Sequence, residues 1–325
     1  MVSVIVLNYN AAKYAEACLR SVLATNYPNF EVIVVDNAST DGSFELIREL
    51  FVRKVILLRN TRNLGYAEGN NIGFQHSRGD IIAFLNIDTE VTEDWLMELV
   101  RALASEEVGA VQSALFKLRD RRSIDSLGWT IDPIGYAYAA WLDSHSKKPG
   151  ELFYAEGSAM AIRRETLVEV LIDGVLFDSD FFLSFEDLDL SWRLRLKGYK
   201  ILLVRSSVVY HSRSYGLADD SYQKVYYNSR NRIATLIKNY DVKQLFTWVP
   251  LLLLLEIVRT FLFLYRNPSK APAKLHGMTW NLANIRSTWR KRAFVQSKMR
   301  KISDSEILNA MRRPNARRWF LSMYP

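Results

Sequence analysis

Acidic residues that could take part in catalysis stand together near the middle of the chain. Glu186, Asp187 and Asp189 fall within four positions, shortly before Trp192. Because like charges at this spacing repel one another, one carboxylate can stay basic enough to accept a proton in a partly dehydrated site. The same residues also suit the first turn of a helix, whose N-terminus favours acidic side chains. The segment predicts a general base, preferably Asp187, with capping of a helix, through Ser184 and Asp187, as the alternative.

A further acidic position, Asp88, follows the apolar run Ile81–Leu85. A carboxylate at the end of a buried strand can bind a hard divalent cation together with diphosphate oxygens. The alternative role for Asp88 is to form the turn before the next helix. His211 ends another hydrophobic run and could be a second ligand, although a single histidine after a strand is more often a structural hydrogen-bonding residue.

Short apolar runs alternate with longer amphipathic stretches along the first 90 residues. The runs are Val2–Leu7, Glu31–Val35, Val55–Leu58 and Ile81–Leu85. This alternation predicts an α/β fold with a mainly parallel sheet and helices on both faces. In such sheets ligands bind beyond the carboxyl ends of the strands, where the loops meet. Polar residues follow three of the runs at these ends: Asn8, Tyr9, Asn10, Asp36, Asn37, Ser39, Asn86 and Asp88. We expect one site lined by three loops; the alternative is that these are ordinary turn residues.

Two classes of site are disfavoured by the sequence. Gly65, Gly69 and Gly73 do not form the Gly-x-Gly-x-x-Gly turn of a dinucleotide fold, so a typical NAD site is not expected. Cys18 is the only cysteine, which excludes a disulfide framework and a cysteine metal site within the chain. Met1 leads directly into the first apolar run, so we expect the amino-terminal part to stay in the cytoplasm.

Length and charge divide the chain into two parts. Its 325 residues can form one large domain and an appendage, and the hydrophobic share of 49% supports a folded core. Residues 266–325 hold 14 Lys and Arg against two acidic residues, which gives this segment a net charge of +12 within a total of +8. Such a basic segment could bind nucleic acid or anionic lipid, and the apolar stretch before it favours lipid.

That apolar stretch covers residues 246–265, about the length of a membrane-spanning helix. Glu256 and Arg259 interrupt it, and each would cost about 2.5–3.5 kcal/mol near the centre of a bilayer. A helix lying in the membrane plane therefore competes with a span. Further on, Trp280, Leu282, Ile285 and Trp289 share one helical face, and Arg286, Arg290, Lys291 and Arg292 lie nearby. This pattern favours an interfacial helix over one that faces a protein core.

Several segments taken in order closely resemble family 2 glycosyltransferases with the GT-A fold, in particular the rhamnosyltransferase-like branch. They are Val2–Asn10, Val34–Ser43, Asn63–Asn71, Phe84–Thr89, Phe185–Arg193 and Tyr226–Arg232. The resemblance covers residues 2 to about 232. It is specific for the family and carries little information on the sugar.

The resemblance implies positions for the donor and the metal. Residues placed at the nucleotide-sugar donor are Leu7, Tyr9, Asp36, Arg62, Asn63, Gly65 and Asn86. Asp88 is expected to bind Mg²⁺ or Mn²⁺, and His211 becomes the expected second ligand. Asn86 stands where many members have Asp, so this motif brings one carboxylate fewer to the metal.

The resemblance also implies a mechanism. Asp187 would take the proton of an acceptor hydroxyl during a single displacement with inversion at the anomeric carbon. Glu186, Asp189 and Trp192 are expected to position the acceptor, with Trp192 stacking on a sugar ring.

We therefore expect a GT-A catalytic domain over residues 1–235 and a basic, apolar, membrane-associating helical region over 236–325. The expected reaction moves a sugar from a UDP- or dTDP-linked donor to a lipid-linked saccharide at the cytoplasmic face of an anionic membrane, without a nucleic acid partner. One alternative is a nucleotidyltransferase acting on sugar phosphates, but residues 7–13 lack its glycine-rich triphosphate loop. Another is an inactive adaptor that binds membrane or RNA through the tail.

Overall fold

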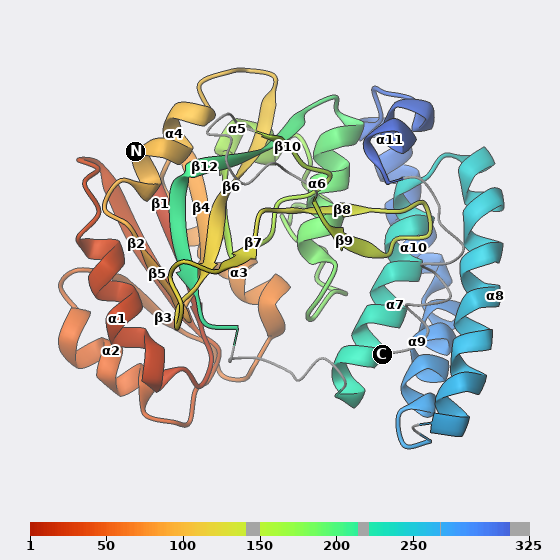
Figure 1. Cartoon of the computed structure of the whole chain (residues 1–325), viewed down its shortest axis with the longest axis horizontal. Coiled ribbons are helices and arrows are strands. Elements are labelled where there is room, and N and C mark those ends of the chain that lie inside the picture. The colour runs from red at the N-terminus through yellow and green to blue at the C-terminus, as the bar shows by residue number, and fades with distance from the viewer. Residues whose placement is uncertain (141–149, 214–220, 267, 313–325) are drawn as a thin grey trace.

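The computed structural model describes residues 1–140, 150–213, 221–266 and 268–312. Its centre is a ten-stranded sheet whose main path has the order β10-β12-β6-β11-β4-β1-β2-β3 (Figure 1). The first strands are β1 (Val2–Asn8), β2 (Phe30–Asp36), β3 (Ile56–Arg59) and β4 (Ile81–Asn86). Each lies within one residue of a predicted apolar run at either end. These four strands pair in parallel, which confirms the predicted sheet.

The later strands extend this sheet and make it mixed. They are β5 (Thr89–Val91), β6 (Val108–Lys117), β7 (Ile124–Ser126), β10 (Gly150–Glu151), β11 (Ala159–Arg163) and β12 (Lys200–His211). Strand β11 runs antiparallel between β4 and β6, while β12 is parallel to β6 and pairs with β5 on its other side. Strands β8 (Trp129–Ile131) and β9 (Ala137–Ala139) form a separate two-stranded sheet.

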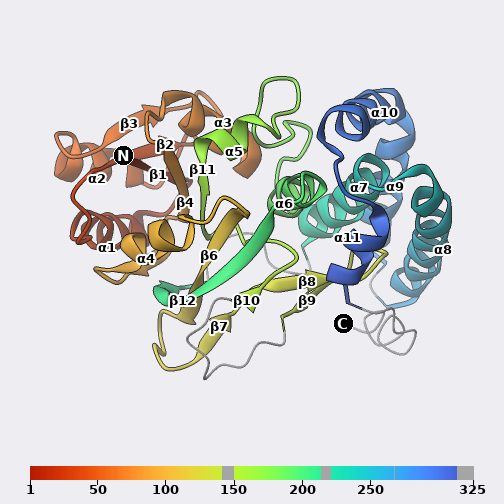
Figure 2. The ribbon, with the colours of Figure 1, turned by 90° about the horizontal axis from the view of Figure 1, so that it is seen from above.

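Helices cover both faces of the sheet. One face carries α1 (Ala12–Leu23), α2 (Ser43–Phe51) and α4 (Trp95–Ala102), and the other carries α3 (Gly65–His76), α5 (Arg164–Val168) and α6 (Glu186–Leu196) (Figure 2). Alternate residues of β1 enter two separate cores: Val4 and Val6 pack with α1, and Ile5 packs with α3. This two-sided burial is why the strands read as continuous apolar runs.

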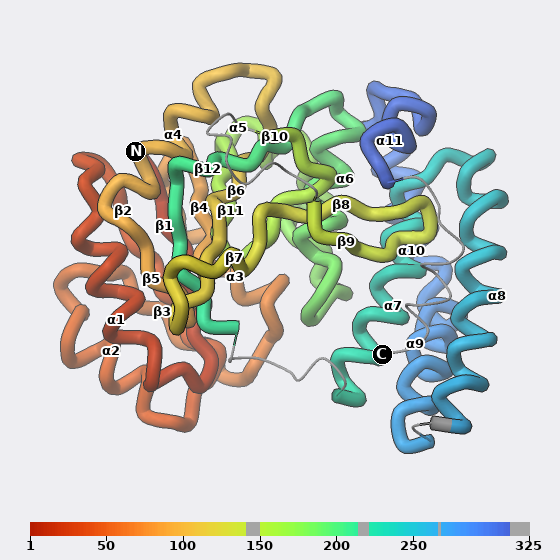
Figure 3. The backbone as a smooth tube through the Cα atoms, viewed as in Figure 1, coloured from red at the N-terminus to blue at the C-terminus, as the bar shows by residue number. Residues whose placement is uncertain are grey.

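A layer of helices stands beside α6, on the side away from the first strands (Figure 3). It consists of α7 (Tyr222–Asn239), α8 (Val242–Arg266), α9 (Ala271–Ala283), α10 (Ile285–Phe294), the π-helix η1 (Val295–Met299) and α11 (Asp304–Ala310). Helix α7 packs against α6, α8, α9 and α10. The division into 1–235 and 236–325 stays a prediction, but its boundary falls inside the continuous helix α7.

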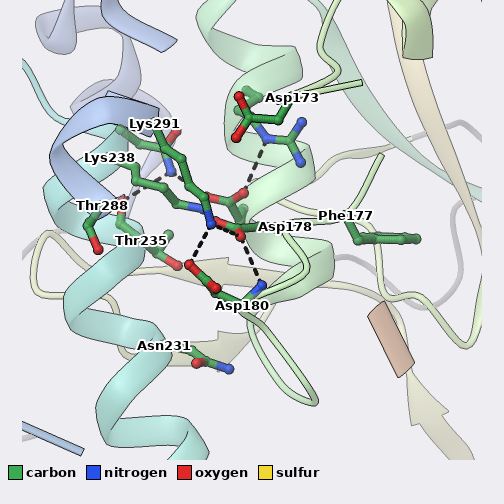
Figure 4. A network of polar contacts seen from close by, with 12 residues as sticks. Asp173, Phe177, Asp178, Asp180, Asn231, Thr235, Lys238, Thr288 and Lys291 are labelled. Carbon is green, nitrogen blue, oxygen red and sulfur yellow. Dashed lines mark hydrogen bonds and ion pairs between the residues drawn. The ribbon is translucent and has the colours of Figure 1, made fainter. Parts of the chain in front are cut away.

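Part of the basic surplus of the C-terminal segment is buried. Lys291 forms ion pairs with Asp178 and Asp180, and Lys238 of α7 joins the same network at 2.5 Å from Asp178 (Figure 4). Arg292 donates hydrogen bonds to backbone carbonyls of α7 and its C-cap. The expectation that Lys291 and Arg292 face lipid phosphates is therefore wrong, because both side chains bind inside the protein. Residues 313–325, which carry three more arginines of the surplus, lie outside the described residues.

Candidate active site

The parallel register brings the predicted loops together at one edge of the sheet. Leu7 of β1 lies beside Asn86 of β4, and Asn8 lies beside Asp36 of β2. The carboxyl ends of these strands therefore meet, as parallel strands of matched length require. Tyr9 follows immediately and is 38% exposed, so its ring is free to contact a flat ligand.

Asp36 supports this edge from inside. Its side chain is fully buried, and its carboxylate accepts hydrogen bonds from the Asn8 amide at 2.7 Å and the Ser39 backbone N–H at 3.1 Å. The guanidinium of Arg59 lies 3.6 Å away. We revise the predicted direct contact between Asp36 and the nucleoside, because this carboxylate holds the loop together and does not face open space.

The predicted donor loop around Gly65 is tied to a distant segment. Asn37 donates to the Gly65 carbonyl at 2.9 Å, and Asn63 accepts from the Gly65 N–H at 2.9 Å. Gly65 has φ +81°, and a Cβ at this position would lie 2.3 Å from the Phe182 carbonyl oxygen. Only glycine fits such a backbone approach. Arg62 is exposed at the start of this loop.

Asp88 and His211 come together through the pairing of β5 with β12. Thr89 is the register partner of His211, which brings His211 Nε2 to 3.3 Å from Asp88 Oδ1. The other oxygen, Asp88 Oδ2, is buried and has no hydrogen-bond partner among the described residues. On its far side the His211 ring contacts Asp125 through Nδ1 at 3.1 Å. A carboxylate that orients a histidine in this way is typical of the surroundings of metal-binding histidines.

These groups fit a hard divalent cation. Burial alone would lower the pKa of His211, but hydrogen bonds to Asp125 and Asp88 outweigh it and raise that pKa to about 9. The site thus favours a positive charge between the imidazole and Asp88, and the unpaired oxygen and the ring nitrogen are ligands that Mg²⁺ or Mn²⁺ can use. Among the described residues, no three His, Cys, Asp or Glu side chains form a metal-binding group. A cation at Asp88 and His211 would therefore take further ligands from a diphosphate or water.

Asp187 is the second residue of α6 and remains partly exposed. It accepts hydrogen bonds from the N–H groups of Gly157 at 3.1 Å and Leu188 at 2.7 Å. Burial, and then the charge of Glu156, raise its pKa to about 6 against these hydrogen bonds. A half-exposed carboxylate with this pKa is ionised near neutral pH and still basic enough to accept a proton.

The neighbouring Glu186 is different. It is buried, Oε2 has no partner, and burial together with the charge of Asp187 raises its pKa well above the ordinary value. The two neighbouring carboxyl groups therefore differ, because the pKa of buried Glu186 is raised well above its ordinary value while partly exposed Asp187 keeps a pKa of about 6. The acceptor-binding role of Glu186 stays a prediction.

Two chains of contacts connect Asp187 with the Asp88 loop. In the first, the Asn86 N–H donates to the Ser158 carbonyl at 3.0 Å, one residue after Gly157. In the second, Arg213 contacts Asp125 at 2.7 Å and Glu156 at 2.8 Å, which links the partner of His211 to the segment that binds Asp187. Asp88 and Asp187 thus belong to the same edge of the molecule.

The turn before α6 is strained. Ser184 and Phe185 have φ values of +70° and +72°, a region that costs non-glycine residues about 1–3 kcal/mol each. Buried Asn231 of α7 holds the turn by donating to the Leu183 carbonyl at 2.9 Å and the Ser184 carbonyl at 2.7 Å. Phe185 occupies the N-cap position and no side chain caps the helix, so the predicted capping box of Ser184 and Asp187 is wrong.

Two predicted acceptor-binding residues are buried in the protein. Asp189 is fully buried between Arg193 at 3.1 Å and Lys238 at 3.0 Å. Trp192 is also fully buried, with its ring edge-to-face against Phe153 and Tyr240. The acceptor-binding role is wrong for both, because the packing of α7 against α6 covers them.

Three residues that support the site were not assigned by the sequence. Asp125 orients His211, Asn231 holds the strained turn, and Tyr66 donates to the Gly157 carbonyl at 2.6 Å. Asn231 and Tyr66 stand inside the segments that carry the family resemblance, which is a signal for them. Asp125 lies in a short edge strand, where its sequence context gives no signal.

Comparison with known proteins gives consistent matches. The model of the family described as glycosyl transferase family 2 matches residues 3–171, a range that includes Asp88 but ends before Asp187 and His211. The glycosyltransferase AglE of Haloferax volcanii is 36% identical over 115 residues, covering 34% of this chain and 38% of that protein. An uncharacterized glycosyltransferase of a Nostoc species is 29% identical over 175 residues, or 52% of each chain. The chain thus spans about half or less of the length of these relatives.

Solved structures share the fold at low sequence identity. GalNAc-T7 with UDP, GalNAc and Mn²⁺ superposes with a TM-score of 0.62 at 19% identity, covering 74% of this chain and 48% of that one. The mannosyltransferase PcManGT of Pyrobaculum calidifontis with GDP-Man and Mn²⁺ gives 0.54 at 21% identity, covering 91% and 84%. These similarities confirm the predicted GT-A fold. The rhamnosyltransferase-like branch stays a prediction.

Proposed function

Because the chain belongs to glycosyltransferase family 2, we propose that it moves a sugar from a UDP- or dTDP-linked donor to a lipid-linked saccharide, with inversion at the anomeric carbon. One observation carries this proposal. The partly exposed base Asp187 is linked through Gly157 and Ser158 to the loop that holds the unpaired oxygen of Asp88. A proton acceptor and a diphosphate-binding position on one edge are what a direct displacement requires.

In this reaction Asp187 accepts the proton of the acceptor hydroxyl as that oxygen attacks the anomeric carbon. The Gly157 N–H fixes the carboxylate. Glu186, the neighbouring residue, would help to position the acceptor. Tyr9 contacts the nucleoside, while Leu7, Asn86 and the loop over Arg62–Gly65 line the donor site. Since the displacement is direct, no sugar-enzyme bond forms.

Asp88 and His211 would hold Mg²⁺ or Mn²⁺ at the donor diphosphate. When bound, the cation neutralises charge that develops on the leaving nucleoside diphosphate. Asp125 keeps the His211 ring oriented so that Nε2 faces Asp88. The unpaired Asp88 oxygen supports this assignment, because a buried carboxylate oxygen without a donor is costly unless a ligand completes it.

The membrane part of the proposal rests on the outer surface of the helical layer. Among the described residues, one helix, Val242–Tyr265, is long and apolar enough to cross a membrane by length and composition. Large apolar side chains of α8 are exposed on its outer face: Val242, Phe246, Leu254, Ile257, Val258, Phe261, Leu264 and Tyr265. Exposed apolar side chains of the next two helices are Leu275, Leu282, Ile285, Trp289 and Phe294. Apolar surface on this scale favours contact with lipid.

The opposite face of α8 favours a helix that lies in the membrane plane. Glu256 is fully buried. Its carboxylate accepts hydrogen bonds from Tyr136 and Ser229 and forms ion pairs with Arg232 and Lys274, all at 2.9–3.1 Å. A span would carry this charged cluster and the polar helix α7 into the hydrocarbon core, where such groups are costly. We therefore propose peripheral attachment at the cytoplasmic face of an anionic membrane.

The transfer proposal is tested with purified full-length protein, Mn²⁺, a panel of UDP- and dTDP-sugars and total lipid extract. We expect one donor to give labelled lipid-linked product together with nucleoside diphosphate. Release of pyrophosphate from a nucleoside triphosphate and a sugar phosphate would support the nucleotidyltransferase alternative instead. Binding of vesicles without any turnover would support an inactive adaptor.

The membrane proposal is tested by flotation with vesicles containing anionic lipid. Phe261→Glu should weaken flotation, whereas Val52→Glu, at a similarly exposed apolar position on the other side of the protein, should not. Carbonate at high pH should release the bound protein, because an in-plane helix does not cross the bilayer. Retention after carbonate would indicate a span.

A further inference from the structure

An open cavity of about 480 Å³ lies between α7 and α9, apart from the site described above. Its lining consists of Tyr222, Tyr226, His276, Thr279, Trp280 and Ala283. The volume is within the range of about 300–1,000 Å³ that is usual for small-molecule sites. Most of the lining side chains combine a flat apolar surface with a polar atom at the edge.

A series of aromatic rings leads from the donor loop to this cavity. The backbone and ring of Phe182 press against Gly65. The Phe182 ring stacks on Tyr227 with centroids 5.3 Å apart and planes 14° apart. Tyr227 contacts Tyr226 at 5.1 Å, and Tyr226 lines the cavity. The cavity is therefore continuous with the catalytic edge through a surface of rings.

Arg230 fixes these rings in place. Its buried guanidinium lies 5.3 Å from the Tyr226 ring, 4.9 Å from the Tyr227 ring and 4.5 Å from the Trp280 ring. It also donates to the Asn231 side chain at 2.8 Å. A ring array held by a buried cation is pre-organised, so little side-chain freedom is lost when a ligand binds.

The rings are not simply part of the protein core. Tyr222 is 36% exposed, and Tyr226, Tyr227 and Trp280 keep partial exposure. A pyranose ring has an apolar C–H face and a polar rim of hydroxyls, which matches aromatic faces edged by hydroxyl, imidazole and indole groups. The hydroxyls of Tyr222 and Tyr226 already have partners in His276 and Arg230, so the preference for a sugar over a prenyl chain rests on the flat ring faces and on the indole edge of Trp280.

We propose that this cavity is an acceptor subsite that binds an internal sugar unit of the acceptor saccharide. The proposal rests on the function proposed above and specifies its acceptor. Because the rings of Tyr227 and Phe182 lie between the cavity and the donor loop, the sugar bound in the cavity would differ from the terminal sugar that reacts at Asp187. The enzyme should therefore prefer acceptors of at least two or three sugars over a single sugar with the same aglycone.

The test fills the cavity without removing any of its rings. Ala283 is exposed at the end of α9 and lines the cavity, so Ala283→Trp should occupy it, and Ala283→Ser is the matched control. The probes are mono-, di- and trisaccharides of the gluco, galacto and rhamno series, each linked to alkyl chains of several lengths. Binding is measured by saturation-transfer NMR and transfer by steady-state kinetics with the preferred donor.

We expect Ala283→Trp to raise KM for the trisaccharide about tenfold, which corresponds to the loss of one good ring contact. The kcat, the KM for the monosaccharide and the rate of donor hydrolysis without acceptor should stay unchanged. Tyr226→Ala should act in the same direction, and Tyr226→Phe should restore most of the affinity. Equal effects on mono- and trisaccharide, or no effect on either, would overturn the subsite. A loss that follows the length of the alkyl chain rather than the number of sugars would assign the cavity to lipid and overturn it as well.

The binding measurement separates this proposal from the proposed reaction. If wild-type protein binds the trisaccharide more tightly than the monosaccharide, and Ala283→Trp removes the difference, the subsite stands even when none of the donors is turned over. If the wild type transfers sugar but binds all three probes equally, the subsite fails while the reaction stands.

Discussion

Two buried carboxylates in this protein have contrasting surroundings. Glu256, in the helical layer, has a partner on each oxygen, and the positive charges of Lys274 and Arg232 outweigh burial and lower its pKa. Asp88, at the edge of the sheet, faces His211 with one oxygen, and its other oxygen has no partner in the part of the chain that the structure describes. A satisfied buried charge indicates a structural role, whereas an unsatisfied one indicates a place for a ligand.

The largest expected effect lies at the sheet edge. Asp187→Asn removes the proposed base while keeping its shape, so kcat should fall about 10²- to 10⁴-fold. Donor affinity, measured by calorimetry with the nucleoside diphosphate, should stay within about twofold because the change does not touch Asp88. Turnover at the wild-type rate would reject Asp187 as the base.

In the helical layer the corresponding change should alter stability instead of chemistry. Glu256→Gln leaves Lys274 and Arg232 buried without a counter-charge, so the free energy of unfolding should fall by about 3–5 kcal/mol. Urea unfolding followed by circular dichroism measures the loss. The rate of transfer per folded molecule should be unchanged. A loss of kcat in a variant that stays stably folded would contradict a purely structural role for Glu256.

The carboxylate behind His211 offers an intermediate case. Asp125→Asn weakens the orientation of the imidazole without removing a proposed ligand, and such changes typically lower metal affinity about 10- to 100-fold. Mn²⁺ affinity is measured by electron paramagnetic resonance in the presence of nucleoside diphosphate. Asp120→Asn, at an exposed carboxylate on the loop before β7, serves as the control and should leave affinity unchanged. Equal affinity in both variants would show that Asp125 does not support a metal site at His211.

The strained turn tests whether the helical layer positions the base. Asn231→Ala removes two hydrogen bonds that hold the turn over Leu183 and Ser184. The strained backbone of this turn, which costs about 1–3 kcal/mol per residue, can then relax and move Asp187. We expect kcat to fall about tenfold while KM for the donor stays constant. Asn281→Ala breaks a comparable contact between α9 and α7 and should not lower kcat. A fall in both variants would indicate general loosening of α7.

The smallest effect is on the pH profile. Asp187 must be unprotonated to act as a base, and its pKa is raised to about 6. Transfer should therefore fall about tenfold for each pH unit below about 6 and level off above it. This fall in rate at acidic pH should be absent from the residual activity of Asp187→Asn. If the rate instead fell only below a pH of about 4, Asp187 would not keep its raised pKa in the donor complex.

The sheet half could be predicted because its sequence signals are local. Strands β1 to β4 are buried on both faces, so they read as apolar runs, and their parallel pairing places Asn8, Asp36 and Asn86 at one edge. The family resemblance then supplied roles for Asp88, His211 and Asp187. Single residues within this edge still depend on packing: nothing in the sequence distinguishes exposed Tyr9 from buried Asp36.

The helical half could not be predicted to the same depth. Almost every residue of α6 is buried, polar ones included, so its sequence lacks the one-sided pattern of a surface helix. Asp189 and Lys291 look like solvated charges until the distant partners Lys238 and Asp178 are known. Such pairings span 49 to 113 positions of the chain, and no short-range spacing encodes them.

The continuity of helix α7 limits how this enzyme can be shortened. A chain that stops at residue 235 would lose Lys238, which neutralises Asp178 and Asp189, as well as Asn239, which donates to Asp189. The cut would leave Asp178 and Asp189 without this counter-charge and would expose the face of α7 that α8 to α10 now cover. The smallest folded unit should therefore extend well past Tyr226–Arg232, the last segment of the family resemblance, and include helices α8 to α10.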